Sequence, residues 1–455
     1  MKYDLIILGG GPAGTQAAER AAQAGQTVLL FEPSALGGVC LNEGCIPTKT
    51  LLVSARTLDN TRTAGKFGVV VPPGTLDMAA VQKRRQKVVR TLAAGLRTRL
   101  KKQGVTVLPH AARLAGRQDG GFAVCAGEEM YYARHVLLAT GSQSALLPIC
   151  GLRQTLASGF ALTSREALLL QELPASIVIV GAGVIGLEFA SFFCSCGCEV
   201  TMVEALDHIA GAMDEGVSAM LMQQMARRGV RFMLSARAVR FGQGEVEVET
   251  HGQRQVLRAE KALFCIGRTP NVQGLGLETL PIEVHDGAIV TDAHMQTTQP
   301  GVYACGDVNG RSMLAHTAHH EAEVAVAHML GGQNTMNYGA VPAVLYTNPE
   351  AACVGLTEQA AREDGRAVRV LQLSMRFSGR FVAENEGGDG VCRLVVENGS
   401  DRIVGVHLLG NDSAEIIALA VQFVQRGMTL MEVQNLVFAH PTVAEVLREA
   451  AFLQA

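Results

Sequence analysis

The sequence lacks the features that direct a chain to a membrane, to nucleic acid or out of the cell. The chain has no large excess of positive or negative charge, because it contains 39 Lys and Arg and 42 Asp and Glu, which gives a net charge of -3. Neither nucleic acid nor an anionic membrane is therefore expected as a main partner. The longest apolar run, residues 177–193, contains Glu188, Ser191 and three glycines. It predicts a buried strand and helix, not a membrane span.

Cysteine is present without a regular framework. The eleven cysteines are an odd number with irregular spacing, which argues against a disulfide scaffold of the secreted type. The N-terminal stretch MKYDLIILGGGPAG has an apolar patch too short for a spanning helix, and it enters a glycine motif instead of a cleavage site. We therefore expect no signal peptide and a reducing, cytoplasmic location.

Glycine, in contrast, is abundant, with 50 residues, and its first cluster follows an apolar run. Residues 3–8 predict a buried parallel strand, and Gly9, Gly11 and Gly14 come directly after it. An Ala-rich helical stretch and a second apolar run then lead to Glu32. This order is typical of a dinucleotide site, because the glycines let the backbone approach a pyrophosphate, the helix N-terminus stabilises its charge, and the acid binds ribose hydroxyls.

The same pattern recurs in the middle of the chain. Residues 177–180 lead into Gly181, Gly183 and Gly186, and a later apolar run ends at Glu204. The step from the second glycine to the acid is 21 residues in both copies. The repeat indicates either two bound dinucleotides or one dinucleotide and a duplicated relic. Two dinucleotides are the better interpretation, because a flavin between a dithiol and a nicotinamide transfers electrons readily.

Glu204 also predicts which nicotinamide dinucleotide binds. Its carboxylate is expected at the adenosine ribose, where a 2'-phosphate at about 4 Å would meet like charge at a cost of roughly 4 kcal/mol. The next residues, ALDH, offer no Arg to bind such a phosphate. NAD is therefore expected in preference to NADP, unless the side chain of Glu204 points to solvent.

Residues 37–52, GGVCLNEGCIPTKTLL, set Cys40 and Cys45 on either side of Gly44. Two thiols this close can form one dithiol/disulfide couple, or they can be independent. An unbroken helix would hold their Cα atoms about 7.5 Å or more apart, beyond the roughly 7 Å that a disulfide tolerates. If the two are bonded, the backbone must be distorted around Gly44. A short disulfide in a reducing compartment is expected to be catalytic and not structural.

The chain changes in character from residue 339. The run VCRLVVENGSDRIVGVHLLG predicts an antiparallel hairpin around its Asn-Gly turn. Near the end, His440 precedes Pro441 and Thr442, and Glu445 follows five residues later. This pair supplies an imidazole and a carboxylate that can orient it, although a His-Pro sequence taken alone predicts only a turn.

The motifs and their order resemble the class I pyridine nucleotide-disulfide oxidoreductases. That order is FAD fingerprint, cysteine pair, the Thr-Gly turn of LLATGS, NAD fingerprint, the Gly-Asp of GVYACGDV and the terminal His-Pro-Thr, and it covers the whole chain. The resemblance implies an α/β fold with two Rossmann-like FAD/NAD(P)-binding domains and an α+β C-terminal dimerisation domain. The implied domains are an FAD-binding domain in 1–146 completed by a central segment in 271–338, an NAD-binding domain in 147–270, and an interface domain in 339–455.

The resemblance also implies which residues contact each cofactor. For FAD these are Gly9, Gly11, Pro12, Ala13, Gly14, Glu32, Pro33, Gly38, Val39, Cys40, Lys49, Thr140, Gly141, Ser142, Gly306, Asp307, Met313, Leu314, Ala315 and His316. For NAD they are Gly181, Gly183, Val184, Ile185, Gly186, Glu188, Glu204, Gly267 and Arg268. The helix that starts near residue 314 would present backbone donors and its dipole to the flavin ring.

Six side chains are expected to carry the chemistry, namely Cys40, Cys45, Lys49, Glu188, His440 and Glu445. By resemblance, Cys40 is the sulfur that the substrate attacks and Cys45 is the one released beside the flavin. His440, oriented by Glu445 of its own chain, would take a proton from the substrate thiol at the disulfide of the other subunit in a homodimer. Lys49 and Glu188 resemble the pair near the flavin N5 edge, or else form a structural salt bridge.

Within the family, CLNEGCIPTK and HPTVAE look most like the branch that oxidises dihydrolipoyl groups and reduces NAD+. The partner would be a dihydrolipoyl group on an acyltransferase core or a lipoyl carrier protein. Glu204 disfavours the NADP-dependent glutathione-reducing branch, and the ending AAFLQA lacks the cysteine pair of the mercury-reducing branch. Glu43 and Phe438 stand where the dihydrolipoyl branch commonly has Val and His. Reduction of another disulfide or metal ion, and redox sensing, therefore remain alternatives.

Three further patterns have simple interpretations. Residues 83–102 hold nine Lys or Arg at helical spacing, which predicts a solvated helix face or, second, a docking face for an acidic partner. The C-x-C-x-C run at residues 194–198 closes a helix, where alternate residues do not share a face for a metal. The histidines of residues 316–320 lack a carboxylate or thiol that would complete a metal site, so no metal is expected.

Overall fold

The structure is a computed structural model and describes residues 2–72, 74–118 and 120–453. Its backbone divides into two units. The first consists of Met1–Thr50, Gln82–Leu146 and Gly267–Met336, and the second of Leu51–Val81, Leu147–Ile266 and Asn337–Ala455. Two long helices pass from one unit into the other, α3 (Cys45–Thr63) and α4 (Met78–Lys102).

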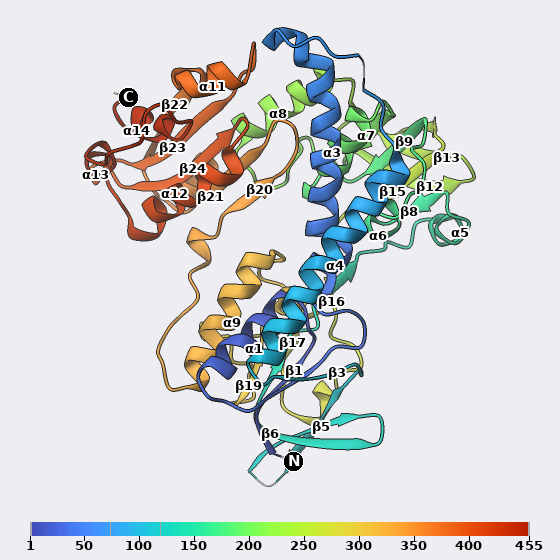
Figure 1. Cartoon of the computed structure of the whole chain (residues 1–455), viewed down its shortest axis with the longest axis vertical. Helices are drawn as coiled ribbons and strands as arrows, with labels where there is room; N and C mark the ends of the chain where they lie inside the picture. Colours follow the sequence, from blue (N-terminus) through green and yellow to red (C-terminus); the bar gives the residue numbers. More distant parts are fainter. Residues whose placement is uncertain (1, 73, 119, 454–455) are drawn as a thin grey trace. The chain divides into compact units, whose positions relative to one another are not determined.

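A seven-stranded sheet forms the centre of the first unit (Figure 1). Its strands run in the order β3-β2-β1-β6-β5-β4, and β19 pairs in parallel with the end of β6. The pairs β2-β3, β1-β2 and β1-β6 are also parallel, whereas β5 runs antiparallel to both of its neighbours. The strands are β1 (Lys2–Leu8), β2 (Val28–Phe31), β3 (Thr106–Leu108), β4 (Arg113–Gln118), β5 (Gly121–Ala126), β6 (Glu129–Leu138) and β19 (Val302–Ala304).

The apolar runs of the sequence explain the core of this unit. Ile6 and Leu8 of β1, Leu29 of β2 and Val136 of β6 are almost fully buried in one cluster, as predicted for strands covered on both faces. α1 (Pro12–Gln23) and α9 (Ala315–Met329) lie side by side (Figure 1). The smaller elements are α2 (Gly38–Glu43), η2 (Leu277–Thr279), η3 (Asp307–Asn309) and two ribbons, β7 (Ser142–Ser144) with β16 (Arg268–Pro270) and β17 (Val284–His285) with β18 (Ala288–Ile289).

The second unit contains another parallel sheet, with five strands in the order β11-β10-β9-β15-β8. A three-stranded antiparallel sheet, β12-β13-β14, lies between β11 and β15 in the chain. The strands are β8 (Ala161–Leu162), β9 (Ser176–Val180), β10 (Glu199–Val203), β11 (Arg231–Met233), β12 (Ala236–Gly242), β13 (Glu245–Thr250), β14 (Gln253–Arg258) and β15 (Lys261–Phe264). The helices are η1 (Ala64–Phe67), α5 (Leu152–Ala157), α6 (Ser164–Ala167), α7 (Val184–Ser195) and α8 (Glu215–Arg227).

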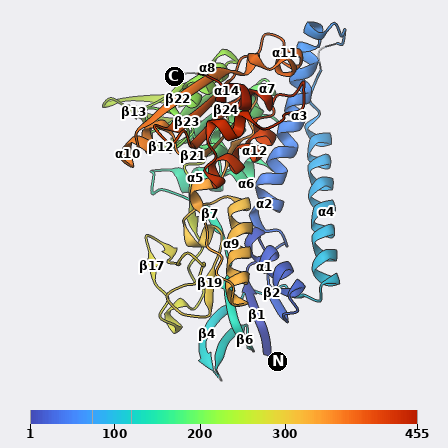
Figure 2. The ribbon, with the colours of Figure 1, turned by 90° about the vertical axis from the view of Figure 1, so that its left-hand side faces the viewer.

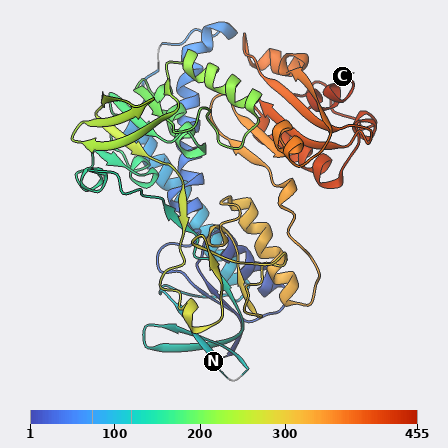
Figure 3. The same ribbon diagram turned by 180° about the vertical axis from the view of Figure 1, so that it is seen from behind.

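The C-terminal part of the second unit is an antiparallel sheet of order β20-β21-β24-β23-β22, drawn in orange and red in Figure 3. The hairpin predicted around Asn398-Gly399 is confirmed, because β23 and β24 pair across this turn and Gly399 has φ +83°. The strands are β20 (Ala343–Leu345), β21 (Ala351–Gly355), β22 (Val368–Ser374), β23 (Val391–Glu397) and β24 (Ile403–Leu409). The helices are η4 (Tyr338–Ala340), α10 (Glu358–Glu363), η5 (Met375–Phe377), α11 (Gly379–Glu384), α12 (Ser413–Arg426), α13 (Leu430–Gln434) and α14 (Glu445–Ala451).

One buried cluster ties the parts of the second unit together. It includes Leu51 of α3, Leu187 of α7 and Leu221 of α8 together with Leu345 and Leu409 of the C-terminal sheet. The second fingerprint and the C-terminal sheet therefore share a core. No helix in the described part of the chain is long and apolar enough to cross a membrane.

Candidate active site

The two cysteines of the redox segment are joined by a disulfide. α2 ends at Glu43 and α3 begins at Cys45, so Gly44 interrupts the helix between the two sulfurs. The interruption brings the Cα atoms of Cys40 and Cys45 to 4.7 Å, within the range that a disulfide requires. The predicted distortion is confirmed, because Gly44 has φ -145° and ψ -107°, outside the helical region.

Neighbouring groups hold this segment in place. Asn42 donates through Nδ2 to the carbonyl of Gly38 at 2.9 Å, and the hydroxyl of Thr48 donates to the carbonyl of Gly44 at 2.6 Å. Gly38 has φ +56°, and a Cβ atom there would lie 2.7 Å from the Cα of Gly11. The redox segment therefore packs directly on the turn of the first fingerprint.

The first fingerprint turn is closed on its inner side and open on its outer side. A Cβ atom on Gly9 would lie 2.2 Å from a backbone oxygen, and one on Gly14 would lie 1.9 Å from another. At Gly11 the nearest atom would be 3.9 Å away. Glu32 accepts the backbone N–H of Gly10 at 2.8 Å, so its carboxylate lies beside the turn. This cradle fits the pyrophosphate and ribose of a dinucleotide.

The second fingerprint repeats this geometry. A Cβ atom on Gly181 would lie 2.5 Å from a backbone oxygen and one on Gly186 would lie 2.0 Å from another, whereas at Gly183 nothing lies within 4 Å. Glu204 follows β10 and accepts the backbone N–H of Ala182 at 2.6 Å. Each unit of the structure therefore contains one complete dinucleotide cradle, with the acidic residue in the same position.

A polar cluster in the first unit joins three of the predicted cofactor residues. Arg268 donates to the hydroxyl and to the carbonyl of Ser142, both at 2.7 Å, and lies 3.8 Å from the carboxylate of Asp307. The hydroxyl of Ser142 donates to Asp307. Burial lowers the pKa of Arg268, and the charges of Asp307 and Glu43 oppose this effect. The sequence assigns Arg268 to NAD, but the structure places it among residues assigned to FAD.

Two side chains that the sequence patterns did not reveal, Glu321 and Asn271, form hydrogen bonds with the backbone of the Gly-Asp and Thr-Gly turns. Glu321 of α9 is fully buried and accepts the N–H of Gly306 at 2.6 Å. Asn271 donates through Nδ2 to the backbone carbonyl of Thr140 at 3.0 Å. The backbone carbonyl of Asn271 accepts the Thr140 hydroxyl at 2.8 Å. Neither belongs to a local motif. Only the folded structure shows that they fix the Gly-Asp and Thr-Gly turns.

The remaining predicted cofactor positions are mostly at the starts of helices. α1, α7 and α9 have no side-chain hydrogen bond at their N-caps, which are Gly11, Gly183 and Leu314. The first turns of these helices therefore offer backbone N–H groups to an anion or a flavin ring. The positions are Pro12 and Ala13 in α1, Pro33 after Glu32, Val39 in α2, Gly141 before β7, Val184 and Ile185 in α7, Gly267 before β16, and Met313, Ala315 and His316 around the start of α9.

Lys49 and Glu188 belong to different units. Lys49 lies in the first turns of α3, one turn after Cys45. Glu188 lies in α7, is 3% exposed, and accepts the backbone N–H of Tyr346 at 3.2 Å. The expected pairing of the two side chains stays a prediction.

The predicted acid–base pair is present near the end of the chain. Nδ1 of His440 lies 2.7 Å from one carboxylate oxygen of Glu445, and the other oxygen accepts the backbone N–H of Thr442 at 2.8 Å. The side chain of His440 is 78% exposed and that of Glu445 is 20% exposed. The hydrogen bond from the backbone of Thr442 and, to a smaller extent, the one with His440 lower the pKa of Glu445. The carboxylate thus stays charged and orients an imidazole that faces outward.

Other cysteines lie in a different environment. Cys194 is in the last turn of α7, Cys196 caps that helix, and Cys198 is buried. Burial raises the pKa of Cys196 to about 12 and that of Cys198 to about 11. Such thiols stay protonated and unreactive at neutral pH. Within the described residues, no group of three or more His, Cys, Asp or Glu could hold a metal ion.

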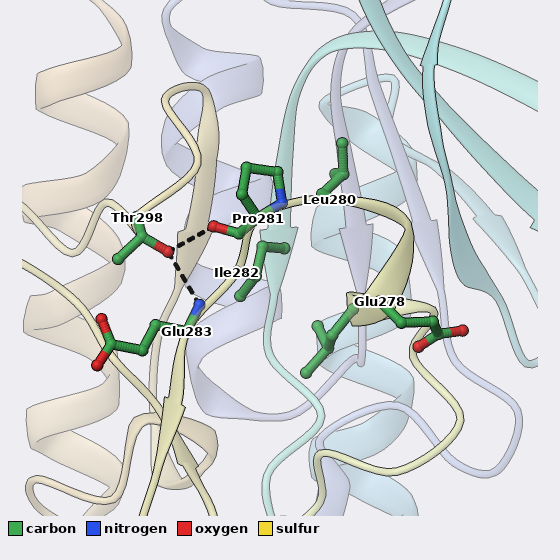
Figure 4. Close-up of a pocket in the computed structure, with 7 residues that line it drawn as sticks. Glu278, Leu280, Pro281, Ile282, Glu283 and Thr298 are labelled. Atoms are coloured by element: carbon green, nitrogen blue, oxygen red, sulfur yellow. Dashed lines mark hydrogen bonds between the residues drawn. The ribbon is translucent and has the colours of Figure 1, made fainter.

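A surface pocket in the first unit contains none of the predicted site residues (Figure 4). The hydroxyl of Thr298 donates to the carbonyl of Pro281 at 2.7 Å and accepts the N–H of Glu283 at 2.9 Å, so the polar atoms of Thr298 are used within the wall. The lining residues are Leu277, Glu278, Leu280, Pro281, Ile282, Glu283 and Thr298.

Comparison with known proteins agrees with this geometry. Residues 3–322 match the family described as pyridine nucleotide-disulphide oxidoreductase, and residues 341–451 match the dimerisation domain of that family. The chain belongs to the pyridine nucleotide-disulphide oxidoreductase family. The family and fold class expected from the sequence are confirmed.

Individual relatives match along almost their whole length. A dihydrolipoyl dehydrogenase of Bacillus subtilis (strain 168) is 37% identical over 450 residues, which cover 98% of this chain and 97% of that protein. A dihydrolipoyl dehydrogenase of Rhizobium etli is 34% identical, with coverage of 98% and 97%. Among solved structures, LpdA from Mycobacterium tuberculosis is 27% identical with a TM-score of 0.89 and covers 98% of each chain. The HOCl-induced flavoprotein disulfide reductase RclA from Escherichia coli is 27% identical with a TM-score of 0.86 and coverage of 99% and 100%.

The family also identifies the cofactors. Its members are oxidoreductases that use FAD and NAD(H), and the two cradles of this chain fit two dinucleotides. The redox segment that holds the Cys40–Cys45 disulfide packs on the turn of the first cradle.

Proposed function

We propose that this chain oxidises a dihydrolipoyl group to its disulfide and reduces NAD+ to NADH. The observation that carries the proposal is the combination, in one chain, of the Cys40–Cys45 disulfide and the oriented His440–Glu445 pair. The full-length similarity to dihydrolipoyl dehydrogenases supports the same substrate. The donor would be a dihydrolipoyl group carried by an acyltransferase core or a lipoyl carrier protein.

The residues divide the reaction between them. His440 takes a proton from one substrate thiol, and Glu445 stabilises the imidazolium that forms. The substrate thiolate attacks Cys40, which breaks the bond to Cys45 and forms a mixed disulfide. The second substrate sulfur then displaces Cys40 and gives its proton to that sulfur, leaving the cyclic disulfide product, Cys40 as a thiol and Cys45 as a thiolate. When bound, FAD would supply the two-electron link between the reduced cysteines and NAD+.

Other residues would position the cofactors and the charge. Lys49, one turn after Cys45, is suited to stabilise negative charge on that sulfur and on the flavin, with Glu188 as its partner. Asp307 would accept hydrogen bonds from the flavin's sugar part, and Glu204 would bind the ribose of NAD. In this proposal, residues 1–146 and 271–338 bind FAD, residues 147–270 bind NAD, and residues 339–455 form the dimer interface. His440 then serves the disulfide of the partner subunit.

A single anaerobic experiment tests the substrate. The purified protein is mixed with dihydrolipoamide and NAD+, and separately with glutathione disulfide and NADPH. We expect rapid NADH formation in the first mixture, and its loss in Cys45→Ser and His440→Gln. Cys150→Ser, which changes an exposed free cysteine, is the matched control and should retain activity. Turnover of another disulfide alone would reject the dihydrolipoyl substrate. Glu43, whose charge raises the pKa of Arg268, would then be the first residue to change.

A further inference from the structure

α4 carries an unusual concentration of positive charge. Residues 83–102 contain nine of the chain's 39 Lys and Arg and no Asp or Glu, although the whole chain has a net charge of -3. Three of the nine have structural partners in the first unit. Arg84 donates to the carbonyl of Thr50, Arg85 donates to Gln82, and Arg99 forms an ion pair with Glu19 of α1. α4 lies beside α1 in Figure 2.

Five of the other cations form a line on the exposed side of this helix. They occur at positions i, i+4, i+7, i+14 and i+18, which places them within one third of a helical turn of each other over a length of about 27 Å. All five are exposed, and none forms an ion pair with another described residue. We call them the α4 stripe: Lys83, Lys87, Arg90, Arg97 and Lys101.

Only Lys101 of the stripe, in the last turn, has a position that stabilises the helix on which the stripe lies. Like charges three and four residues apart repel each other, and α4 has no acidic residue to offset them. The helix is held instead by its opposite face, where Leu96 and Leu100 are buried. Repulsion within the stripe therefore destabilises α4 in the isolated chain, and a negatively charged partner would reduce this repulsion.

The composition of the exposed face favours one class of partner. α4 contains no Phe, Tyr or Trp, so it has no platform on which single-stranded bases could stack. The line of the stripe is interrupted only by Ala94 and contains no large apolar side chain. Helices that insert into a lipid surface require such side chains, so a membrane is not favoured as the partner. A folded protein domain with acidic side chains on its surface satisfies both conditions.

We propose that the α4 stripe docks the acidic surface of the protein domain that carries the dihydrolipoyl group. The inference rests on the proposed function, because it names the form in which that substrate arrives. Docking raises the local concentration of the lipoyl arm around the enzyme without any contact to the reacting sulfurs. The stripe should therefore act on the protein-borne substrate and not on free dihydrolipoamide.

The test compares two variants of equal charge. The first is Lys87→Gln, Arg90→Gln, Arg97→Gln and Lys101→Gln, in which Gln keeps the helix propensity. The second is Arg153→Gln, Arg227→Gln, Arg237→Gln and Arg258→Gln, which changes exposed arginines of the second unit that form no ion pair within the described residues. Each is assayed with free dihydrolipoamide and with a recombinant, reduced lipoyl domain of net negative charge, at low and high salt.

We expect the stripe variant to lose about tenfold in kcat/KM for the lipoyl domain, with a flatter salt dependence, and to keep wild-type rates on dihydrolipoamide. The control variant should match wild type on both substrates. Equal rates of the two variants on the lipoyl domain would overturn the docking surface. Loss of binding to heparin or anionic vesicles in the stripe variant, with the lipoyl domain unaffected, would also overturn it. Wild-type protein that oxidises neither substrate would reject the proposed function itself, and fluorescence anisotropy with the labelled domain would still report docking.

Discussion

Nδ1 of His440 lies 2.7 Å from the carboxylate of Glu445. A carboxylate can only accept, so Nδ1 carries the proton and Nε2 is the basic nitrogen that faces outward. The second oxygen of Glu445 is held by the N–H of Thr442 at 2.8 Å, and this fixes the carboxylate relative to the loop. The loop thus provides a base of defined tautomer and direction.

Replacing Glu445 should weaken this base without unfolding the chain. The pKa of Glu445 is lowered. The carboxylate is therefore fully charged at any pH above the ordinary pKa of a Glu, and the stabilisation that it provides is lost only when the pH falls through the lowered pKa. We expect Glu445→Gln to reduce kcat with dihydrolipoamide by about tenfold or more. The acid limb of kcat/KM should move to lower pH, because the imidazolium loses its counter-charge.

The control for this change is Glu449→Gln, one turn further along α14 and on the surface. It should leave both the rate and the pH profile unchanged. NADH-dependent reduction of ferricyanide requires no substrate thiol, so it should be unaffected in both variants. A wild-type pH profile in Glu445→Gln would contradict the orienting role.

Gly183→Ala should separate folding from cofactor binding. The backbone of Gly183 has φ -77°, and a Cβ atom would meet nothing within 4 Å, so the variant should fold and keep its thermal stability. The same methyl group would occupy the approach of a pyrophosphate, and we expect the KM for NADH to rise roughly tenfold. Gly95→Ala, which is equally open but lies on α4, should not change this constant. An unchanged KM in Gly183→Ala would exclude the second cradle as the NAD site.

Glu204→Gln should relax the choice between NADH and NADPH. The substitution removes the negative charge that repels a 2'-phosphate, so the ratio of the two kcat/KM values should shift toward NADPH by about tenfold or more. Glu199→Gln is the matched control, because Glu199 is an exposed carboxylate at the other end of β10. Steady-state rates with both dinucleotides measure the effect. Equal shifts in the two variants would mean that the charge acts from a distance and not at the ribose.

Alkylation should distinguish buried thiols from accessible ones. The pKa of Cys196 is raised to about 12 and that of Cys198 to about 11 by burial, so neither forms a thiolate at neutral pH. Mass spectrometry after brief iodoacetamide treatment of the native protein should find label at the exposed Cys150 and not at these two positions. Denatured protein, treated in the same way, should be labelled at all three. Rapid labelling of Cys196 in the native protein would contradict this prediction and would favour a redox role for residues 194–198.

Local spacing was sufficient to predict the elements that form the two cradles. In each copy, the strand before the first glycine, the helix after it and the acid at Glu32 or Glu204 lie within about 30 residues, so their geometry follows from short-range rules. The break at Gly44 was also predictable, because a straight helix cannot bring Cys40 and Cys45 close enough to bond.

Contacts between distant segments could not be predicted in this way. Arg268 follows the second fingerprint in sequence, yet it bonds to Ser142, 126 residues earlier. Asp59 of α3 accepts the hydroxyl of Ser195 at 2.8 Å and forms an ion pair with Arg228, and no local pattern connects these positions. Such contacts depend on how sheets and helices pack, which the periodicity of one segment does not determine.

The break at Gly44 makes the two sulfurs electrostatically unequal. Cys45 is the first residue of the 19-residue helix α3, at the end where the peptide dipoles leave a partial positive charge, whereas Cys40 lies inside a helix of six residues. Once the bond between them is cleaved, this difference favours negative charge on Cys45 over Cys40. The backbone interruption that permits the disulfide therefore also places only one of its two sulfurs at the start of a long helix.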